Sequence, residues 1–178
     1  FALSFFHDES YKKSEDILVE QNYQELEVWY PYYRLKEAGI DTFFVGPQAN
    51  KEYPSKLGYP AITHRAALDV KTSDIHGLII PGGWAPDYLR RHKEIVSLTQ
   101  EMVIANKPVG AICHGGWLLC SAKVIRNRKV TSFSAIRDDM ENAGAVWIDA
   151  EVIQDENIIT SRKPDDLPAF MKAFLSIL

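Results

Sequence analysis

Short runs of apolar residues alternate along the chain with longer stretches in which apolar positions recur at helical spacing. Such alternation is typical of parallel strands joined by crossover helices. In the first two thirds of the chain the pattern predicts strands at 17–19, 42–45, 77–80 and 108–112 and helices at 26–38, 87–106 and 115–122. The turn-rich stretch 50–71 predicts a hairpin or loop excursion at the edge of the sheet.

The last third of the chain continues the alternation. It predicts a strand at 129–133, a helix at 136–143, a hairpin over 145–162 that turns at 155–157, and a closing helix over 164–178. Proline at the start of that closing helix stands where helices tolerate it. The whole pattern predicts an α/β protein with a mostly parallel central sheet and helices on both faces.

Composition narrows the class of protein without changing the predicted fold. The chain has 178 residues, 46% of them hydrophobic, and a net charge of −4. This length suits one domain, which we place at 15–178 behind an N-terminal extension at 1–14. No basic cluster of the kind that neutralises phosphates is present, so we expect no nucleic-acid partner. The apolar runs fall short of the ~20 residues of a membrane span, so we expect no membrane partner either.

Two cysteines, Cys113 and Cys120, are too few for a disulfide framework. Their number favours a reducing compartment, and we therefore expect a cytoplasmic protein. Cys120 lies within an apolar helical stretch, where a cysteine is usually a small core residue.

Cys113 stands where an apolar strand passes into a helix, in the sequence GAICHGG. A nucleophile at such a turn needs small neighbours two residues before and after it, and Ala111 and Gly115 satisfy that need. The start of the following helix favours the thiolate, and an adjacent imidazolium would lower the pKa further. The pattern therefore favours a reactive cysteine over a buried structural one.

An adduct on Cys113 would need hydrogen-bond donors for its developing negative oxygen. Gly82 and Gly83 follow a different strand at the same expected sheet edge. We predict that the backbone N–H groups of Gly83 and His114 form this oxyanion hole. A tight turn alone also explains the two glycines.

The five histidines constrain the general base, because none of them follows His114. A glutamine amidotransferase mechanism, which takes its histidine from a later segment, is thereby disfavoured. His114 is the candidate base, and a purely structural histidine at a helix start is the alternative. No metal-ligand spacing and no nucleotide-binding glycine motif occurs, so we expect no metal and no cofactor.

Three motifs in order resemble the ThiJ/PfpI superfamily, in particular its PfpI-type intracellular protease branch. They are YPYYRLKEAG at 30–39, PGGWAPD at 81–87 and AICHG at 111–115. The resemblance covers residues 15 to 178 and implies a flavodoxin-like three-layer sandwich with Cys113 as nucleophile. It also implies that His114 pairs with an acid from a neighbouring subunit, which maps onto Asp87. Gly82, Trp84 and Gly115 are expected to line the site.

In this superfamily a glutamate after the first strand approaches the nucleophile, and the alignment assigns Gln24 to that position. Glu25 and Glu27 are expected to point elsewhere. An amide can hydrogen-bond a thiolate but cannot exchange a proton, so this assignment predicts weak acid–base chemistry at that position.

The resemblance implies a cysteine-dependent hydrolase or hydratase that acts on a small carbonyl or peptide-like substrate, as a protease, a glyoxalase or a deglycase. An alternative is an oxidative-stress sensor or chaperone-like module whose Cys113 is oxidised with little turnover. Isonitrile hydration is a third activity of the superfamily. The implied cross-subunit acid predicts a homo-oligomer, either a dimer or a hexamer.

Overall fold

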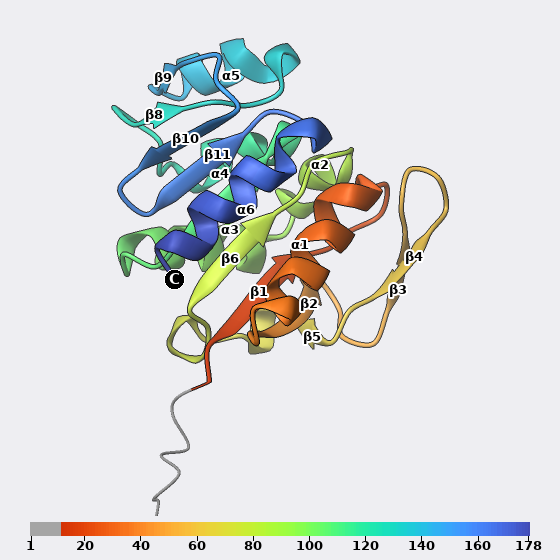
Figure 1. The fold of residues 1–178 in the computed structure, drawn as a ribbon. Helices are drawn as coiled ribbons and strands as arrows, with labels where there is room; N and C mark the ends of the chain where they lie inside the picture. The colour runs from red at the N-terminus through yellow and green to blue at the C-terminus, as the bar shows by residue number, and fades with distance from the viewer. Residues whose placement is uncertain (1–11) are drawn as a thin grey trace, which may run out of the picture.

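The computed structural model describes residues 12–178, and its centre is a seven-stranded sheet (Figure 1). Along the sheet the strands follow the order β10-β11-β7-β6-β1-β2-β5. All neighbouring strands run parallel except β10, which is antiparallel to β11. The strands are β1 (Ser14–Leu18), β2 (Asp41–Gly46), β5 (Arg65–Ala66), β6 (Gly77–Ile80), β7 (Val109–Ile112), β10 (Val152–Asp155) and β11 (Ile158–Ser161).

Helices cover both faces of this sheet. α1 (Glu25–Glu37) and α6 (Leu167–Ser176) pack together on one face, and α3 (Lys93–Ile104) and α4 (Gly116–Ala122) pack together on the other (Figure 1). The predicted three-layer, mostly parallel architecture is therefore confirmed. No helix in the described part of the chain, from residue 12 onward, is long and apolar enough to cross a membrane.

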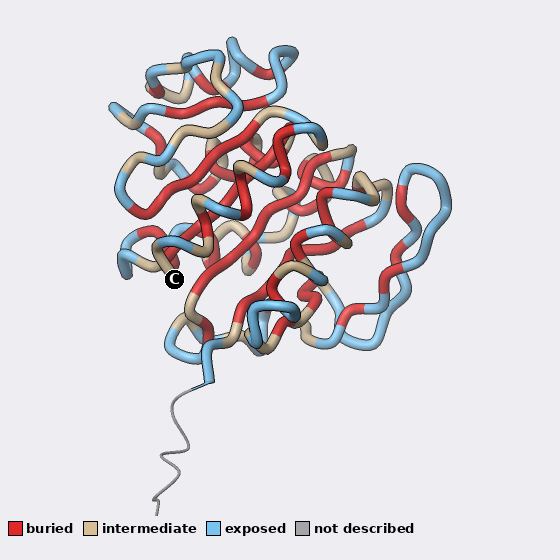
Figure 2. Tube along the Cα trace, in the orientation of Figure 1, coloured by how far each residue is buried: buried red, intermediate tan, exposed pale blue. Residues whose placement is uncertain are grey.

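The core lies along the central strands, which are buried over most of their length (Figure 2). β6 and β7 are buried at every position, as expected for parallel strands that are covered on both faces. Gly110 on β7 leaves room for the ring of Phe170 on α6, because an added Cβ would lie 2.7 Å from that ring. The close approach of α6 holds β7, and with it the turn that follows β7, in a fixed position.

The predicted helix over 87–106 is two helices, α2 (Ala85–Leu89) and α3. The chain leaves the helical region at His92, whose backbone is extended with φ −99° and ψ 112°. Leu89 and Ile95 are both fully buried. In one continuous helix these two side chains would point in directions about 120° apart around the helix axis. The break at His92 lets both of them reach the core.

The predicted strand over 129–133 shrinks to β8 (Lys129–Val130), which pairs with β9 (Val146–Trp147) in a separate two-stranded sheet. This small sheet and α5 (Arg137–Asn142) lie beyond β10 (Figure 1). The predicted hairpin is β10 and β11, which turn at 156–157. The closing helix begins with a 3-10 turn before α6.

The excursion over 50–71 contains a hairpin of β3 (Glu52–Pro54) and β4 (Pro60–Ile62), which stands beside α1 (Figure 1). Within residues 12–178 there are also five 3-10 turns: η1 (Ala67–Asp69), η2 (Thr72–Asp74), η3 (Cys113–Gly115), η4 (Ser134–Ile136) and η5 (Pro164–Asp166). The predicted N-terminal extension at 1–14 falls outside the described residues, apart from 12–14, and β1 already begins at Ser14.

Candidate active site

Cys113 lies in a strained turn directly after β7, at the carboxyl edge of the sheet. Its backbone φ is +60°, which side-chain-bearing residues rarely adopt, and η3 begins at the same residue. Gly115 is required two residues later, because an added Cβ would lie 2.7 Å from the carbonyl oxygen of Ile80. The structure thus shows the tight strand-to-helix turn that the sequence predicts around Cys113.

Two backbone N–H groups lie at the Cys113 sulfur. The sulfur accepts hydrogen bonds from the backbone N–H groups of His114 and Gly83, the two donors that the sequence singles out. Gly83 has φ +71°, and an added Cβ would meet the backbone of Asn22 and Gln24 at 2.5 Å. These donors therefore depend on a glycine turn packed against the segment that leads into α1.

The third neighbour of Cys113 is Glu27, a fully buried residue in the first turn of α1. Its Oε2 accepts from the N–H of Gly82 at 2.7 Å, and its Oε1 is buried without a hydrogen-bond partner among residues 12–178. The carboxyl group lies beside the Cys113 side chain, because a Cβ added at Gly82 would approach both Glu27 Oε2 and Cys113 Cβ. Burial raises the pKa of Glu27 to about 8, against the opposing effect of the Gly82 hydrogen bond. Glu27 is therefore positioned to hold a proton near neutral pH and to exchange it with the sulfur.

The prediction that Gln24 takes the place beside the nucleophile is wrong. Gln24 is the N-cap of α1, and its side-chain oxygen accepts from the N–H of Glu27 at 3.0 Å. The residue that faces Cys113 is Glu27, which was expected to point away. A signal for this was present in the sequence, because Glu27 shares the buried face of the helix with Val28, Pro31 and Leu35.

The Cys113 thiol and the Glu27 carboxyl form a buried pair whose protonation is coupled. Burial is the main effect that raises the pKa of Cys113, to about 12, and the negative charge of Glu27 adds to it. The backbone N–H groups of His114 and Gly83 act in the opposite direction. The lowered pKa expected from the sequence is therefore wrong for this resting state, because burial and Glu27 outweigh the two N–H donors. A protonated Glu27 can instead donate to the sulfur and favour the thiolate.

His114 reaches the nucleophile despite being its neighbour in sequence. Its Nδ1 lies 3.2 Å from the Cys113 sulfur. Burial lowers the pKa of His114, which favours the neutral imidazole. The ring stacks on Phe133 at a centroid distance of 5.0 Å and contacts Trp117 at 5.1 Å and Trp84 at 6.1 Å. Aromatic side chains thus form the rim of the site, and Trp84, 55% exposed, faces the solvent.

Asp87 lies in the first turn of α2 and pairs with Arg91 one helical turn later. No contact between Asp87 and His114 occurs within residues 12–178 of one chain. The expected pairing of Asp87 with His114 of a neighbouring subunit stays a prediction. No group of three metal-ligating side chains is found in this described range either.

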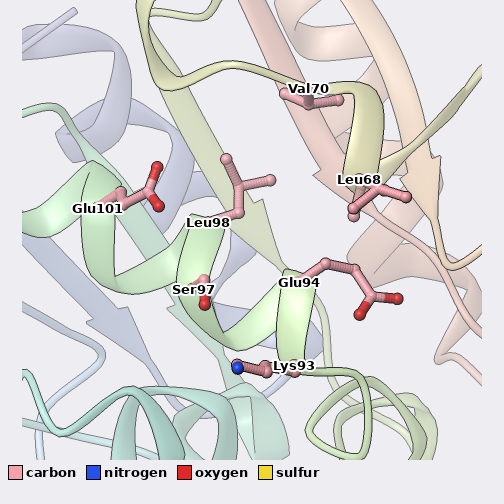
Figure 3. Close-up of a pocket in the computed structure, with 8 residues that line it drawn as sticks. Leu68, Val70, Lys93, Glu94, Ser97, Leu98 and Glu101 are labelled. Atoms are coloured by element: carbon pink, nitrogen blue, oxygen red, sulfur yellow. The ribbon is translucent and has the colours of Figure 1, made fainter.

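A separate cavity of about 360 Å³ lies between η1 and α3 (Figure 3). Leu68, Val70 and Leu98 supply its apolar wall, and Glu94 and Glu101 supply carboxylates (Figure 3). Its lining contains no cysteine and no histidine, so this cavity offers no counterpart to the nucleophile at Cys113.

Gly82 packs between Glu27 and Cys113, so adding a single methyl group at this position tests how tightly the site is packed. An added Cβ would lie 2.5 Å from Glu27 Oε2 and 2.7 Å from Cys113 Cβ. We expect Gly82→Ala to reduce the free energy of unfolding by about 1–3 kcal/mol and to change the pH profile of Cys113 alkylation, measured by mass spectrometry. Gly39→Ala, at a left-handed position with open space around it, should cost about 1–2 kcal/mol and leave the profile unchanged. An unchanged profile in Gly82→Ala would contradict the packing described above.

The fold and the site together define a class of protein: a doubly wound α/β sheet with a cysteine on a strained turn and a buried glutamate beside it. The model of the DJ-1/PfpI family matches residues 16–177. The chain therefore belongs to the DJ-1/PfpI family, as its motifs indicate.

Two curated relatives and one solved structure illustrate the similarity. The chain is 41% identical over 162 residues to deglycase TK1284 of Thermococcus kodakarensis, covering 91% of this chain and 97% of the relative. It is 40% identical over 165 residues to general stress protein 18 of Bacillus subtilis, covering 91% and 95%. A two-domain protein of Anabaena variabilis with DJ-1/ThiJ/PfpI-like and ferritin-like domains superposes with a TM-score of 0.91 at 37% identity. The match covers 93% of this chain but only 48% of that one.

Proposed function

We propose that this protein is a cysteine-dependent hydrolase of the deglycase type, which acts on α-oxoaldehydes or on their adducts with amines. The observation that carries the proposal is the contact between buried Glu27 and Cys113, with two backbone N–H donors at the same sulfur. The 41% identical relative named a deglycase supports it. A structural cysteine would need neither the strained backbone nor the buried carboxyl group.

The proposed reaction balances without a cofactor. The Cys113 thiolate adds to the aldehyde carbon of R–CO–CHO and forms a carbon–sulfur bond, while the N–H groups of Gly83 and His114 hold the resulting oxyanion. Glu27 then carries the proton from this carbon to the neighbouring carbonyl carbon, so that the first carbon is oxidised and the second is reduced. Water hydrolyses the thioester and restores the thiol, giving R–CHOH–COO⁻ and a proton. In an amine adduct, R–CO–CH(OH)–NHR′, the thiolate replaces the amine at the same carbon: the carbon–sulfur bond forms, the carbon–nitrogen bond breaks, and the amine leaves with a proton. The later steps are then the same.

The test is turnover of methylglyoxal and of its adduct with a lysine derivative, followed as lactate formation. We expect Cys113→Ser to reduce turnover by about 10³-fold or more, because the weaker nucleophile removes the covalent step. Cys120→Ser is the matched control and should retain turnover, since Cys120 contacts Met140 and the backbone of Asp139 rather than the site. Circular dichroism would check that both variants fold. Turnover that survives in Cys113→Ser, or absent turnover in the unchanged protein, would refute the proposal.

A second candidate function is an oxidative-stress sensor, which the similarity to general stress protein 18 favours. In that role peroxide would oxidise Cys113 to a sulfenic acid and be reduced to water. Peroxide titration with mass spectrometry separates the two functions. A sensor should show selective oxidation of Cys113 over Cys120 at low peroxide together with negligible turnover of methylglyoxal.

A further inference from the structure

Lys56 lies at the tip of the β3–β4 hairpin. The segment around Tyr23, which leads into α1, lies between this tip and the Cys113 site. The backbone N–H of Lys56 donates to the carbonyl oxygen of Tyr23 at 2.9 Å. Tyr23 in turn forms a β-bridge to Gly83, whose N–H contacts the Cys113 sulfur. The backbone of Lys56 is therefore separated from the glycine turn of the site only by the segment that leads into α1.

The hairpin tip is held firmly in this position. The Glu25 carboxylate accepts from the Leu57 N–H at 2.7 Å and from the Ser55 hydroxyl. The Tyr23 hydroxyl donates to the carbonyl oxygen of Tyr59 at 2.7 Å. These contacts tie the tip to the same segment that positions Glu27, so the base of the Lys56 side chain has a fixed place relative to the site.

The charge of Lys56 acts on both ionisable neighbours of Cys113. Burial raises the pKa of Glu27, and the positive charge of Lys56 opposes that rise. Burial also lowers the pKa of His114, and Lys56 lowers it further. The ammonium group is therefore within electrostatic reach of both groups. The Glu25 carboxylate is a nearby negative charge, but it already accepts the two hydrogen bonds from Ser55 and Leu57.

The other cations near the rim are occupied. Arg91 is ion-paired with Asp87, and Arg90 donates to the Ser121 hydroxyl at 2.8 Å. Lys56 is exposed, and within the described range 12–178 its ammonium group has no carboxylate within 4.0 Å. Its charge is thus available to a ligand bound at the Cys113 site.

We propose that Lys56 is the anion-recognition residue of the Cys113 site, which therefore prefers carbonyl substrates that carry a carboxylate group. The substrate class rests on the proposed function, whereas the role of the charge can be tested on the cysteine alone. A suitable anionic substrate is 4,5-dioxopentanoate, OHC–CO–CH₂–CH₂–COO⁻, which adds water to give 2-hydroxyglutarate. Methylglyoxal, which gives lactate by the same chemistry, is its uncharged counterpart.

The first experiment compares alkylation of Cys113 by iodoacetate and by iodoacetamide, which differ in charge but share their leaving group. We expect Lys56→Met to lower the iodoacetate-to-iodoacetamide rate ratio roughly three- to tenfold at low ionic strength. Any change in thiolate fraction cancels in this ratio. Lys56→Arg should keep the ratio, and added salt should reduce the difference between Lys56→Met and the unchanged protein. Lys172→Met, which removes an exposed lysine on α6, should behave as the unchanged protein.

The second experiment measures kcat/KM for 4,5-dioxopentanoate and for methylglyoxal. We expect the unchanged protein to favour the anionic substrate and Lys56→Met to reduce that preference at least fivefold, mainly through KM. An alkylation ratio that does not respond to Lys56→Met overturns the role of Lys56, whatever the turnover. If the ratio responds but neither substrate is consumed, the proposed function fails and the anion site stands. If both substrates are consumed without discrimination, the substrate class is wrong.

Discussion

Replacing Glu27 with glutamine is expected to reduce turnover of methylglyoxal by roughly 10²–10⁴-fold. Glutamine retains the size of the side chain and can still hydrogen-bond the Cys113 sulfur, but it cannot accept a proton from the substrate carbon. Binding should change less than the chemical step, so the loss is expected in kcat rather than in KM. Initial rates of lactate formation across a range of substrate concentrations measure both constants.

Gln24→Glu is the matched control for that experiment. The side chain of Gln24 caps the first turn of α1 and accepts from the Glu27 N–H, so a carboxylate there should serve equally well as a cap and leave kcat within about threefold. The idea that Glu27 moves the proton would be abandoned if Glu27→Gln kept most of the turnover. A large gain from Gln24→Glu would restore Gln24 to the site.

The second large effect is expected at β1, far from the site, where two neighbouring carboxyl groups are fully buried. Glu15 has no hydrogen-bond partner on either side-chain oxygen, and its carboxyl lies beside Gly77 and the ring of Phe174. Burial raises the pKa of Glu15 to about 9, and the charge of Asp16 adds to this effect. Burial also raises the pKa of Asp16 to about 7, with Arg65 acting in the opposite direction.

These shifts fix the direction of a pH effect on stability. The folded protein holds the Glu15 proton up to about pH 9, whereas the unfolded chain releases it near pH 4.5. The folded state therefore binds more protons across this interval, and the free energy of unfolding falls as pH rises through it. Asp16 adds a fall between about pH 4 and pH 7.

We expect Glu15→Val, which is close in volume and suited to a buried strand, to raise the melting temperature at pH 8 by about 5–10 °C. The gain should shrink towards pH 4.5, where the unfolded chain also begins to hold the proton. Differential scanning calorimetry over pH 4.5–8.5 measures both values. Glu52→Val, an exposed position on β3, controls for loss of charge alone. Equal melting temperatures for Glu15→Val and the unchanged protein at pH 8 would show that Glu15 is solvated.

The sequence predicts the architecture because the periodicities that drive it are strong. The apolar runs at 77–80 and 108–112 are buried on both faces. A short continuous apolar run of this kind is typical of a parallel strand that helices cover on both sides, so its place in the fold can be predicted. The break at His92 and the shortness of β8 were not predictable in the same way. Each depends on which neighbours a side chain meets in the folded state, and local periodicity carries no information about that.

Part of the candidate site can also be predicted from local sequence patterns. Cys113, Gly83 and His114 are tied to motifs at strand ends, where chain geometry dictates small residues and a fixed turn. The motif at 30–39 assigns Gln24 to the place that Glu27 holds in the structure, and only the buried helical face that Glu27 shares with Val28 identifies it. Glu15 was missed because a carboxyl group breaks the apolar pattern, so the strand was expected to begin later, at residue 17.

Two of the groups at the Cys113 sulfur, the N–H groups of Gly83 and His114, belong to the main chain, and this has a consequence for how the family can diversify. Donors that belong to the backbone survive most substitutions as long as the path of the chain is kept, so this pair of donors is inherited with the fold. The rim side chains of Trp84 and Phe133, in contrast, lie on two separate loops, and the proposed anion-recognition residue Lys56 lies on a third. Selection can therefore exchange these side chains one at a time, and new substrates become accessible by single steps that leave the chemical step intact.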